Sequence, residues 1–235
     1  MPSTRFPQTR WSVVLAARDV KDSVAQAALT DLCQIYWKPI YGFCRQMGNA
    51  AEDAEDLTQA FFVKLIEKDF LAKAESKRGR LRSYLLILFK RFLNDQNEKA
   101  QAIKRGGEVQ FVPVDAEDYC PIRAGEVSSP EAQFDRRWAL SVLEAVIEKL
   151  RKEYHDEGKE ELFSSLEGFL SGRPSVTDYG VIAGALEMKE STVRVAVFRL
   201  RRRYGELLRI HVADTVDSPE EIVEELNFLM NALSQ

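Results

Sequence analysis

Apolar residues recur at α-helical spacing along most of this chain. In the segment 53–70, one wide apolar face collects the side chains of Leu57, Phe61, Phe62, Leu65 and Ile66. Similar spacing predicts helices in 9–47, 80–99, 138–150, 160–170 and the segment after Pro219. Alternation of the kind that marks strands is scarce. The pattern therefore predicts an all-α fold.

Two shorter apolar stripes lie between Asp178 and Tyr204, separated by a polar break at 187–190. The first stripe consists of Tyr179, Ile182, Ala183 and Leu186, and the second of Val193, Val197, Leu200 and Tyr204. Ser191 is the expected N-cap of the second helix, because its hydroxyl can accept a backbone N–H of the first turn. Two helices that share one small core across a tight turn predict a helix-turn-helix unit.

The second helix of this unit has a basic face opposite its apolar stripe. At about 100° per residue, the outward positions are Val195, Phe198, Arg199 and Arg202, flanked by Arg194, Arg201 and Arg203. A guanidinium group binds phosphate or guanine, and an exposed Val or Phe can touch a thymine methyl. The face therefore suits the major groove of duplex DNA. The alternative is a surface helix with solvated arginines, on which Phe198 packs against a neighbouring segment.

Charge is distributed unevenly along the chain. The 235 residues are 45% hydrophobic and 30% charged, which is enough for one or two domains. The net charge of −4 is unusual for a protein that binds DNA alone, because affinity for the backbone depends on Lys and Arg. However, 76–94 contains six bases and no acid, and 214–235 contains six acids and no base. This segregation favours a protein that reaches DNA as part of a larger complex.

Basic residues are interleaved with aromatic residues in the segment 80–99. Such a mixture suits single-stranded DNA, since bases neutralise phosphates and rings stack on unpaired bases. The alternative is that the rings of Tyr84, Phe89 and Phe92 belong to the core. The following segment, 100–130, is rich in Gly and Pro and has little periodicity, so it is interpreted as a linker.

A narrow stripe of mostly polar residues lies opposite the apolar face of the 53–70 helix. It consists of Glu52, Asp56, Gln59 and Val63, which follow one another at helical spacing. Taken alone, the stripe is typical of a solvated helix face.

The residues that enzymes, metal sites and membrane spans require are not evident. The cysteines, Cys33, Cys44 and Cys120, lie far apart, and the chain has two histidines. We therefore expect no metal site, no cofactor and no catalytic centre. The chain has no apolar run near 20 residues long, so we expect no membrane span and a cytoplasmic location.

The order of these segments resembles that of bacterial sigma factors of the sigma-70 family, and more narrowly of the extracytoplasmic-function (ECF) group. The resemblance rests on the segment EDAEDLTQAFFVKL, the basic aromatic helix, the linker and the helix-turn-helix, and it covers roughly 29–99 and 138–208. It implies a sigma2-like domain in 1–99, a flexible linker in 100–133 and a sigma4-like domain in 134–213. An acidic amphipathic helix in 214–235 is additional to that pattern.

The resemblance also implies three binding surfaces. The family's polymerase-docking Asp and Gln fall on Asp56 and Gln59, so the surface for core RNA polymerase comprises Glu52, Asp56, Gln59 and Val63. Contacts with the −10 element and its melted strand fall on Arg80, Arg82, Ser83, Tyr84, Lys90, Arg91 and Asn94, with a flipped base taken by the loop 73–79. Contacts with the −35 element fall on Ser191, Thr192, Arg194, Val195, Phe198, Arg199, Arg201 and Arg202.

The implied function is that of an alternative sigma factor, which is not an enzyme. It would bind core RNA polymerase, direct it to promoter DNA and assist melting of the duplex. An anti-sigma factor or another regulator is a third partner that the resemblance allows, and the sequence identifies none. Two alternatives remain open: a stand-alone helix-turn-helix regulator that binds duplex DNA without polymerase, and a helical adaptor that binds only protein.

Two roles are open for the acidic helix in 214–235. Its charge is opposite to that of the recognition helix, so it is a candidate cover for Arg199 and Arg202. The alternative is a packing helix that completes the sigma4-like domain.

Overall fold

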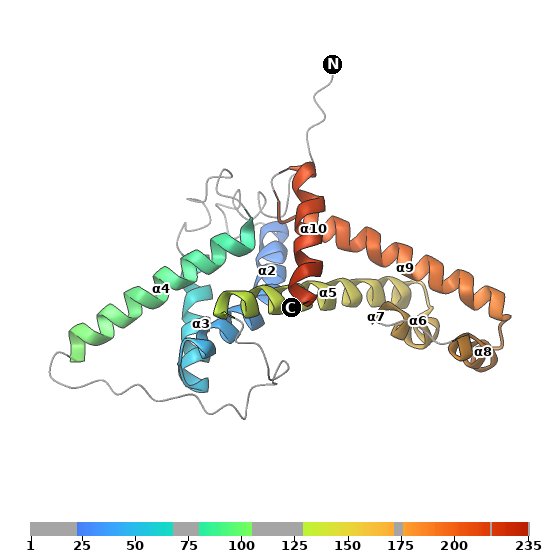
Figure 1. Ribbon diagram of the computed structural model, residues 1–235, viewed down its shortest axis with the longest axis horizontal. Helices are drawn as coiled ribbons and strands as arrows, with labels where there is room; N and C mark the ends of the chain where they lie inside the picture. The colour runs from blue at the N-terminus through green and yellow to red at the C-terminus, as the bar shows by residue number, and fades with distance from the viewer. Residues whose placement is uncertain (1–22, 68–79, 105–128, 172–175, 217, 235) are drawn as a thin grey trace, which may run out of the picture. The chain divides into compact units, whose positions relative to one another are not determined.

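The computed structural model describes residues 23–67, 80–104, 129–171, 176–216 and 218–234 (Figure 1). Every regular element in these ranges is a helix, and they contain no strand. The predicted all-α fold is therefore confirmed. None of the helices within these ranges is both long enough and apolar enough to cross a bilayer.

The helices largely follow the predicted segments. They are α2 (Ser23–Gln46), α3 (Ala51–Glu67), α4 (Leu81–Lys104), α5 (Pro130–Asp156), α6 (Glu160–Leu166), α7 (Gly168–Ser171), α8 (Val176–Ala185), α9 (Glu190–Ala213) and α10 (Pro219–Ser234). The predicted linker differs at both ends, because 100–104 belong to α4 and 130–133 to α5. The remainder of that linker, 105–128, and the loop 73–79 lie outside the described residues.

The described residues form two compact units. The first contains α2, α3, α4, the start of α5 as far as Ser141, and the C-terminal segment from Val212, which includes α10. The second runs from Val142 to His211 and contains the rest of α5, α6, α7, α8 and most of α9. These bounds differ from the predicted domains, since the residues 134–141 and the acidic segment group with the first unit.

Aromatic rings form much of the core of the first unit. The ring of Phe61 in α3 lies 5.0 Å from that of Phe89 and 5.7 Å from that of Phe92, both in α4. Phe43 of α2 contacts Phe89 and, from α5, Phe134, at 6.2 and 6.5 Å. Because these rings follow helical spacing on their own helices, packing the helices together buries them all.

The core of the second unit joins the helix-turn-helix to the helices before it. Val193, Val197 and Leu200 of α9 are buried with Phe163 and Leu166 of α6. The segment 160–171 is therefore an integral part of this core. The outward direction of the remaining side chains of α9 follows from this packing, because the buried stripe fixes the rotation of the helix.

The turn between α8 and α9 is built without glycine. The amide of Met188 donates to the carbonyl of Ala183 at 2.9 Å, and the amide of Glu187 to that of Gly184 at 3.4 Å. This pattern is a Schellman motif, and it places Glu187 in the left-handed region with φ 51°. Since α9 begins at Glu190, Ser191 lies inside its first turn, and the prediction that Ser191 is the N-cap is wrong.

Candidate nucleic-acid interface

The residues predicted to read duplex DNA are exposed on α9. They are Ser191, Thr192, Arg194, Val195, Phe198, Arg199, Arg201 and Arg202. Phe198 is 66% exposed, and Val195 lies beside it on the same face. A helix that has already buried a complete apolar stripe leaves no intramolecular reason for an exposed phenylalanine. The alternative, in which Phe198 packs on a neighbouring segment, does not hold for the part of the chain that the structure describes.

Two arginines of α9 stabilise the second unit. Arg201 donates two hydrogen bonds to the carbonyl of Phe169, from Nε at 3.0 Å and from Nη2 at 2.8 Å. Arg203 forms an ion pair with Glu153 of α5 at 2.7 Å. These bonds raise the pKa of Arg203 and lower the pKa of Glu153. Arg201 therefore holds a helix end, although it was predicted to contact DNA.

The other arginines on this face are held only loosely. Arg202 is 72% exposed and pairs with Glu206 one turn away, at 3.0 Å. Arg194 lies over the ring of Tyr179 and pairs with Glu190. Arg199 forms no hydrogen bond or ion pair with any residue that the structure describes. Exposed pairs of this kind contribute about 0–1 kcal/mol each, so a ligand phosphate can replace them.

On α4, only part of the predicted −10 surface faces solvent. Arg91 and Asn94 are exposed, and Ser83 and Lys90 are half-buried. Arg82 and Tyr84 are buried, so neither can contact DNA in this structure. The rings of Phe89 and Phe92 are buried as well. The hypothesis that the rings of α4 stack on unpaired bases is therefore wrong for this structure, because the aromatics lie on the core stripe.

Sequence reasoning missed Ile87, which is 50% exposed on α4. It lies one turn after Ser83 and one turn before Arg91, in the middle of the exposed face. Its position opposite the stripe of Leu81, Leu85 and Leu88 is the sequence signal that could have found it. This face thus combines an apolar group with bases, as the face of α9 does.

The remaining arginines of the predicted −10 surface contact acids and rings. Arg82 pairs with Glu225 of α10 at 2.8 Å and with Asp135 of α5 at 3.1 Å. Arg80 pairs with Glu224 at 3.1 Å and with Glu225 at 2.9 Å. Burial raises the pKa of Asp135, and the nearby Arg82 only partly opposes that effect. Helix α10 therefore covers Arg82 of α4 and Arg80, which immediately precedes that helix.

This placement differs from both predicted roles of the acidic helix. Helix α10 contacts Arg80 and Arg82, whereas the sequence predicted a cover for Arg199 and Arg202 or a packing helix of the sigma4-like domain. Opposite charge correctly indicated that the acids pair with arginines. It did not indicate which arginines, because two basic segments were available.

The stripe on α3 is exposed as predicted. Glu52, Asp56, Gln59 and Val63 all face solvent, while Phe61, Phe62 and Leu65 are buried on the other side. Along the stripe, two carboxylates and an amide are followed by one apolar side chain, Val63. Such a surface can bind a partner helix through both charge and apolar contact.

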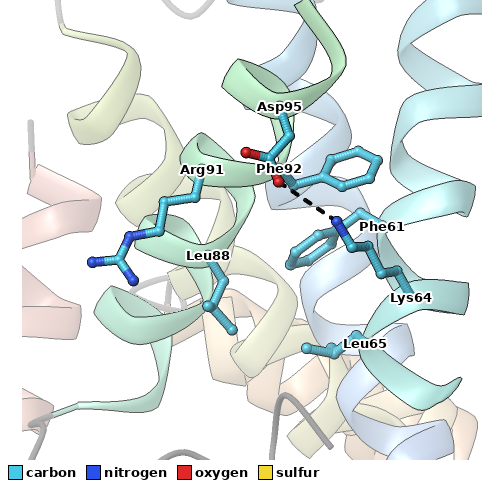
Figure 2. A pocket seen from close by; sticks show the side chains of 7 residues that line it. All are labelled: Phe61, Lys64, Leu65, Leu88, Arg91, Phe92 and Asp95. Atoms are coloured by element: carbon cyan, nitrogen blue, oxygen red, sulfur yellow. Dashed lines mark ion pairs between the residues drawn. The ribbon is translucent and has the colours of Figure 1, made fainter. Parts of the chain in front are cut away.

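A small pocket opens between α3 and α4, with a volume of ≈ 70 Å³. Its floor is apolar, and Figure 2 shows Lys64 and Asp95 paired at its edge, 3.7 Å apart, with the Arg91 guanidinium turned away from them. Pockets for small molecules typically measure about 300–1,000 Å³. This one is large enough only for a part of a side chain.

Comparison of the chain with models of known protein families, with curated proteins and with solved structures finds no match. The surfaces of α3, α4 and α9 are therefore the features from which a function can be inferred. Within the described residues, no group of three or more His, Cys, Asp or Glu side chains is arranged to hold a metal ion.

Proposed function

We propose that this protein is an alternative sigma factor of the ECF type, which binds core RNA polymerase in the cytoplasm and directs it to promoter DNA. The observation that carries the proposal is the exposed face of α9, where Phe198 and Val195 lie among Arg194, Arg199 and Arg202. Arginine can bond guanine or phosphate, and the apolar groups can touch thymine methyls. A helix after a tight turn is the usual element for presenting such a face to a major groove.

Two further surfaces support a polymerase-dependent role. The exposed stripe of α3 offers Asp56 and Gln59 to a protein partner, at the positions that the family resemblance implies. The exposed face of α4 offers Arg91 and Asn94 to DNA, beside the half-buried Lys90, which pairs with Glu131 of α5. Because the chain has a net charge of −4, stable binding to DNA is expected only together with a partner that adds contacts.

In this proposal the protein forms no covalent bond. Binding to polymerase and to duplex DNA positions the complex, and capture of an unpaired strand shifts the melting equilibrium. Opening a few base pairs costs several kcal/mol, at about 1.4 kcal/mol per stacked step. Preferential binding of the unpaired strand is sufficient to shift that equilibrium toward the melted duplex.

The first experiment mixes the purified full chain with bacterial core RNA polymerase and follows co-elution by gel filtration. Co-elution is expected, and Asp56→Arg is expected to abolish it, because the change reverses charge in the centre of the exposed stripe. The matched control is Asp156→Arg, which makes the same substitution at an exposed acid of the second unit. The control variant should co-elute normally.

A second measurement follows promoter selection. With the bound complex, Arg199→Ala should weaken binding to a selected duplex by about 1–3 kcal/mol and relax preference at one base position. If the chain does not co-elute with polymerase but protects a palindromic site on duplex DNA alone, it is a stand-alone helix-turn-helix regulator. If it co-elutes but Arg199→Ala and Arg202→Ala leave transcription unchanged, it is an adaptor that binds only protein.

A further inference from the structure

The acidic helix α10 lies against the arginines at the start of α4. The carboxylate of Glu225 accepts a hydrogen bond from Nε of Arg82 at 2.8 Å and forms an ion pair with Nε of Arg80 at 2.9 Å. This side chain is only 1% exposed. The neighbouring Glu224 pairs with Arg80 at 3.1 Å. One carboxylate thus bridges two guanidinium groups within the first unit.

An aromatic ring of the same helix covers one of these guanidinium groups. Cζ of Arg82 lies 3.5 Å from the centroid of the Phe228 ring and 5.3 Å from that of Trp138. Guanidinium groups bind carboxylates and phosphates with the same planar geometry, and they stack on aromatic faces. The carboxylate of Glu225 therefore occupies a position that suits a phosphate, and the Phe228 ring one that suits a stacked base.

We propose that α10 is a displaceable cover over an anion site formed by Arg80 and Arg82, and that the ligand of the uncovered site is the phosphodiester backbone of DNA. The inference rests on the proposed function in naming DNA as the ligand. It adds a regulatory step, because α10 must leave before DNA can contact Arg80 and Arg82. Displacement would turn two arginines, which are paired in this structure, into contacts with the −10 region.

The contacts of α10 are compatible with exchange. When a phosphate replaces the carboxylate of Glu225, both guanidinium groups keep an anionic partner, so no buried charge is left unpaired. Asp135, which belongs to α5, continues to hold Nη1 of Arg82 in either state, at 3.1 Å in this structure. Val223 and Met230 on the outer face of α10 are exposed, so only one face of the helix is packed. On the packed face, Leu229 and Ala232 are buried, and the ring of Phe228 lies 6.3 Å from that of Trp138.

The test compares binding of a short, fluorescein-labelled, single-stranded oligodeoxynucleotide to full-length variants by fluorescence anisotropy. Glu225→Gln removes the charge that bridges the arginines, and Glu220→Gln removes the same charge from an exposed position on the same helix. If the open state is populated at about 10% or less, Glu225→Gln should bind about tenfold tighter or more. Glu220→Gln should bind within about twofold of the unchanged chain, since charge alone acts weakly at the surface.

The salt dependence identifies the groups that gain contact. Each phosphate contact on a single strand contributes about 0.7 to the slope of log K against log salt, so two arginines should steepen that slope by about 1.4 for Glu225→Gln. Adding Arg80→Gln and Arg82→Gln to Glu225→Gln should remove both the tighter binding and the steeper slope. The proposal is overturned if Glu225→Gln binds no more tightly than Glu220→Gln.

A measurement on the unchanged chain keeps the test decisive if Glu225→Gln folds poorly. Hydrogen exchange of the amides of α10 should become faster when the oligonucleotide saturates the protein, because bound phosphate releases the helix. Unchanged exchange in α10 at saturation would contradict the cover. Failure of the chain to co-elute with polymerase would instead contradict the proposed function, and the anisotropy series would still decide whether α10 covers an anion site.

Discussion

Helices α4 and α9 are both 24 residues long and both carry several arginines, yet they present different surfaces. On α9, Phe198 is exposed beside Arg199 and Arg202. On α4, the aromatic rings are buried, and Arg82 lies under α10. A composition that mixes bases with rings therefore indicates a nucleic-acid surface only where the ring lies off the apolar stripe.

The rotational position of each ring explains the difference. Tyr84 and Phe92 continue the stripe that Leu81, Leu85 and Leu88 define, so packing the stripe buries the rings. Phe198 follows Val193 by five residues, which places it about 140° around the helix from that buried side chain. The comparison predicts that equivalent substitutions in the two helices have unequal effects.

The largest difference is expected between Phe89→Ala and Phe198→Ala. Phe89 is fully buried among three other rings, so its removal should lower the free energy of unfolding by about 3–5 kcal/mol. Phe198→Ala should change it by no more than about 0.5 kcal/mol. Urea denaturation measures both: tryptophan fluorescence reports the first unit, which contains Trp37 and Trp138, and circular dichroism reports the helices of both units.

The same pair of variants separates stability from binding. Phe198→Ala should weaken duplex binding in the polymerase complex while its unfolding curve stays unchanged. A large loss of stability in Phe198→Ala would mean that its ring packs against protein, and the contrast between the two helices would then disappear.

The next difference concerns the arginines. Arg82→Ala leaves the carboxylates of Glu225 and Asp135 without their shared partner, and breaking a buried pair costs about 3–5 kcal/mol. Because Arg80 still contacts Glu225, we expect the free energy of unfolding to fall by about 3 kcal/mol, near the lower end of that range. Arg202→Ala removes only an exposed pair and should cost less than about 1 kcal/mol. The fluorescence of Trp138, which lies beside Arg82, reports the first change.

Equal costs for the two arginine variants would contradict the burial of Arg82. Arg82→Lys gives a further check, since a lysine keeps the charge but loses the planar geometry that serves two acids. It should recover only part of the lost stability.

The sequence predicted the exposed faces of α3 and α9 because each depends only on local period. Asp56 and Phe198 lie opposite apolar stripes that can be counted along the chain. The burial of Tyr84 could have been predicted by the same count. The cover over Arg82 could not, because its partner Glu225 is 143 residues away and no local pattern links the two residues. The bond from Arg201 to the carbonyl of Phe169 is non-local for the same reason.

A smaller effect is expected from pH, with opposite signs at two acids of α5. The hydrogen bond from Arg203 lowers the pKa of Glu153 below its ordinary value of 4.5. The stability that this pair contributes is therefore present above the ordinary pKa and is lost as pH falls through the lowered one. Burial raises the pKa of Asp135 above 3.8, so its contribution is complete below that value and is lost as pH rises through the raised one.

The measurement is the free energy of unfolding of the second unit between about pH 6 and about pH 3. Stability should fall on acidification, and Glu153→Gln should reduce the fall by less than about 1 kcal/mol, because both partners are partly exposed and screened. Glu161→Gln, at an exposed acid of α6, should leave the profile unchanged. A profile that Glu153→Gln does not alter would mean that Arg203 and Glu153 are unpaired in solution.

The smallest expected effect concerns the turn that sets the direction of α9. Glu187 adopts φ 51° there, which costs a residue with a side chain about 1–2 kcal/mol. Glycine avoids that cost, but it gives the unfolded chain more conformational freedom, and losing that freedom on folding costs about 0.5–1 kcal/mol. Glu187→Gly should therefore stabilise the second unit by about 0.5 kcal/mol. Thermal unfolding measures the change.

Gly158, which follows α5 with φ 69°, is the matched control within the same unit. Gly158→Ala should lower the free energy of unfolding of this unit by about 1 kcal/mol, because a residue with a Cβ atom is disfavoured at a positive φ. Glu187→Gly should leave duplex binding unchanged, since the exposed face of α9 begins beyond the turn. If that variant instead weakens DNA binding while raising stability, the Glu187 side chain takes part in recognition, and the binding face extends from α9 into the turn.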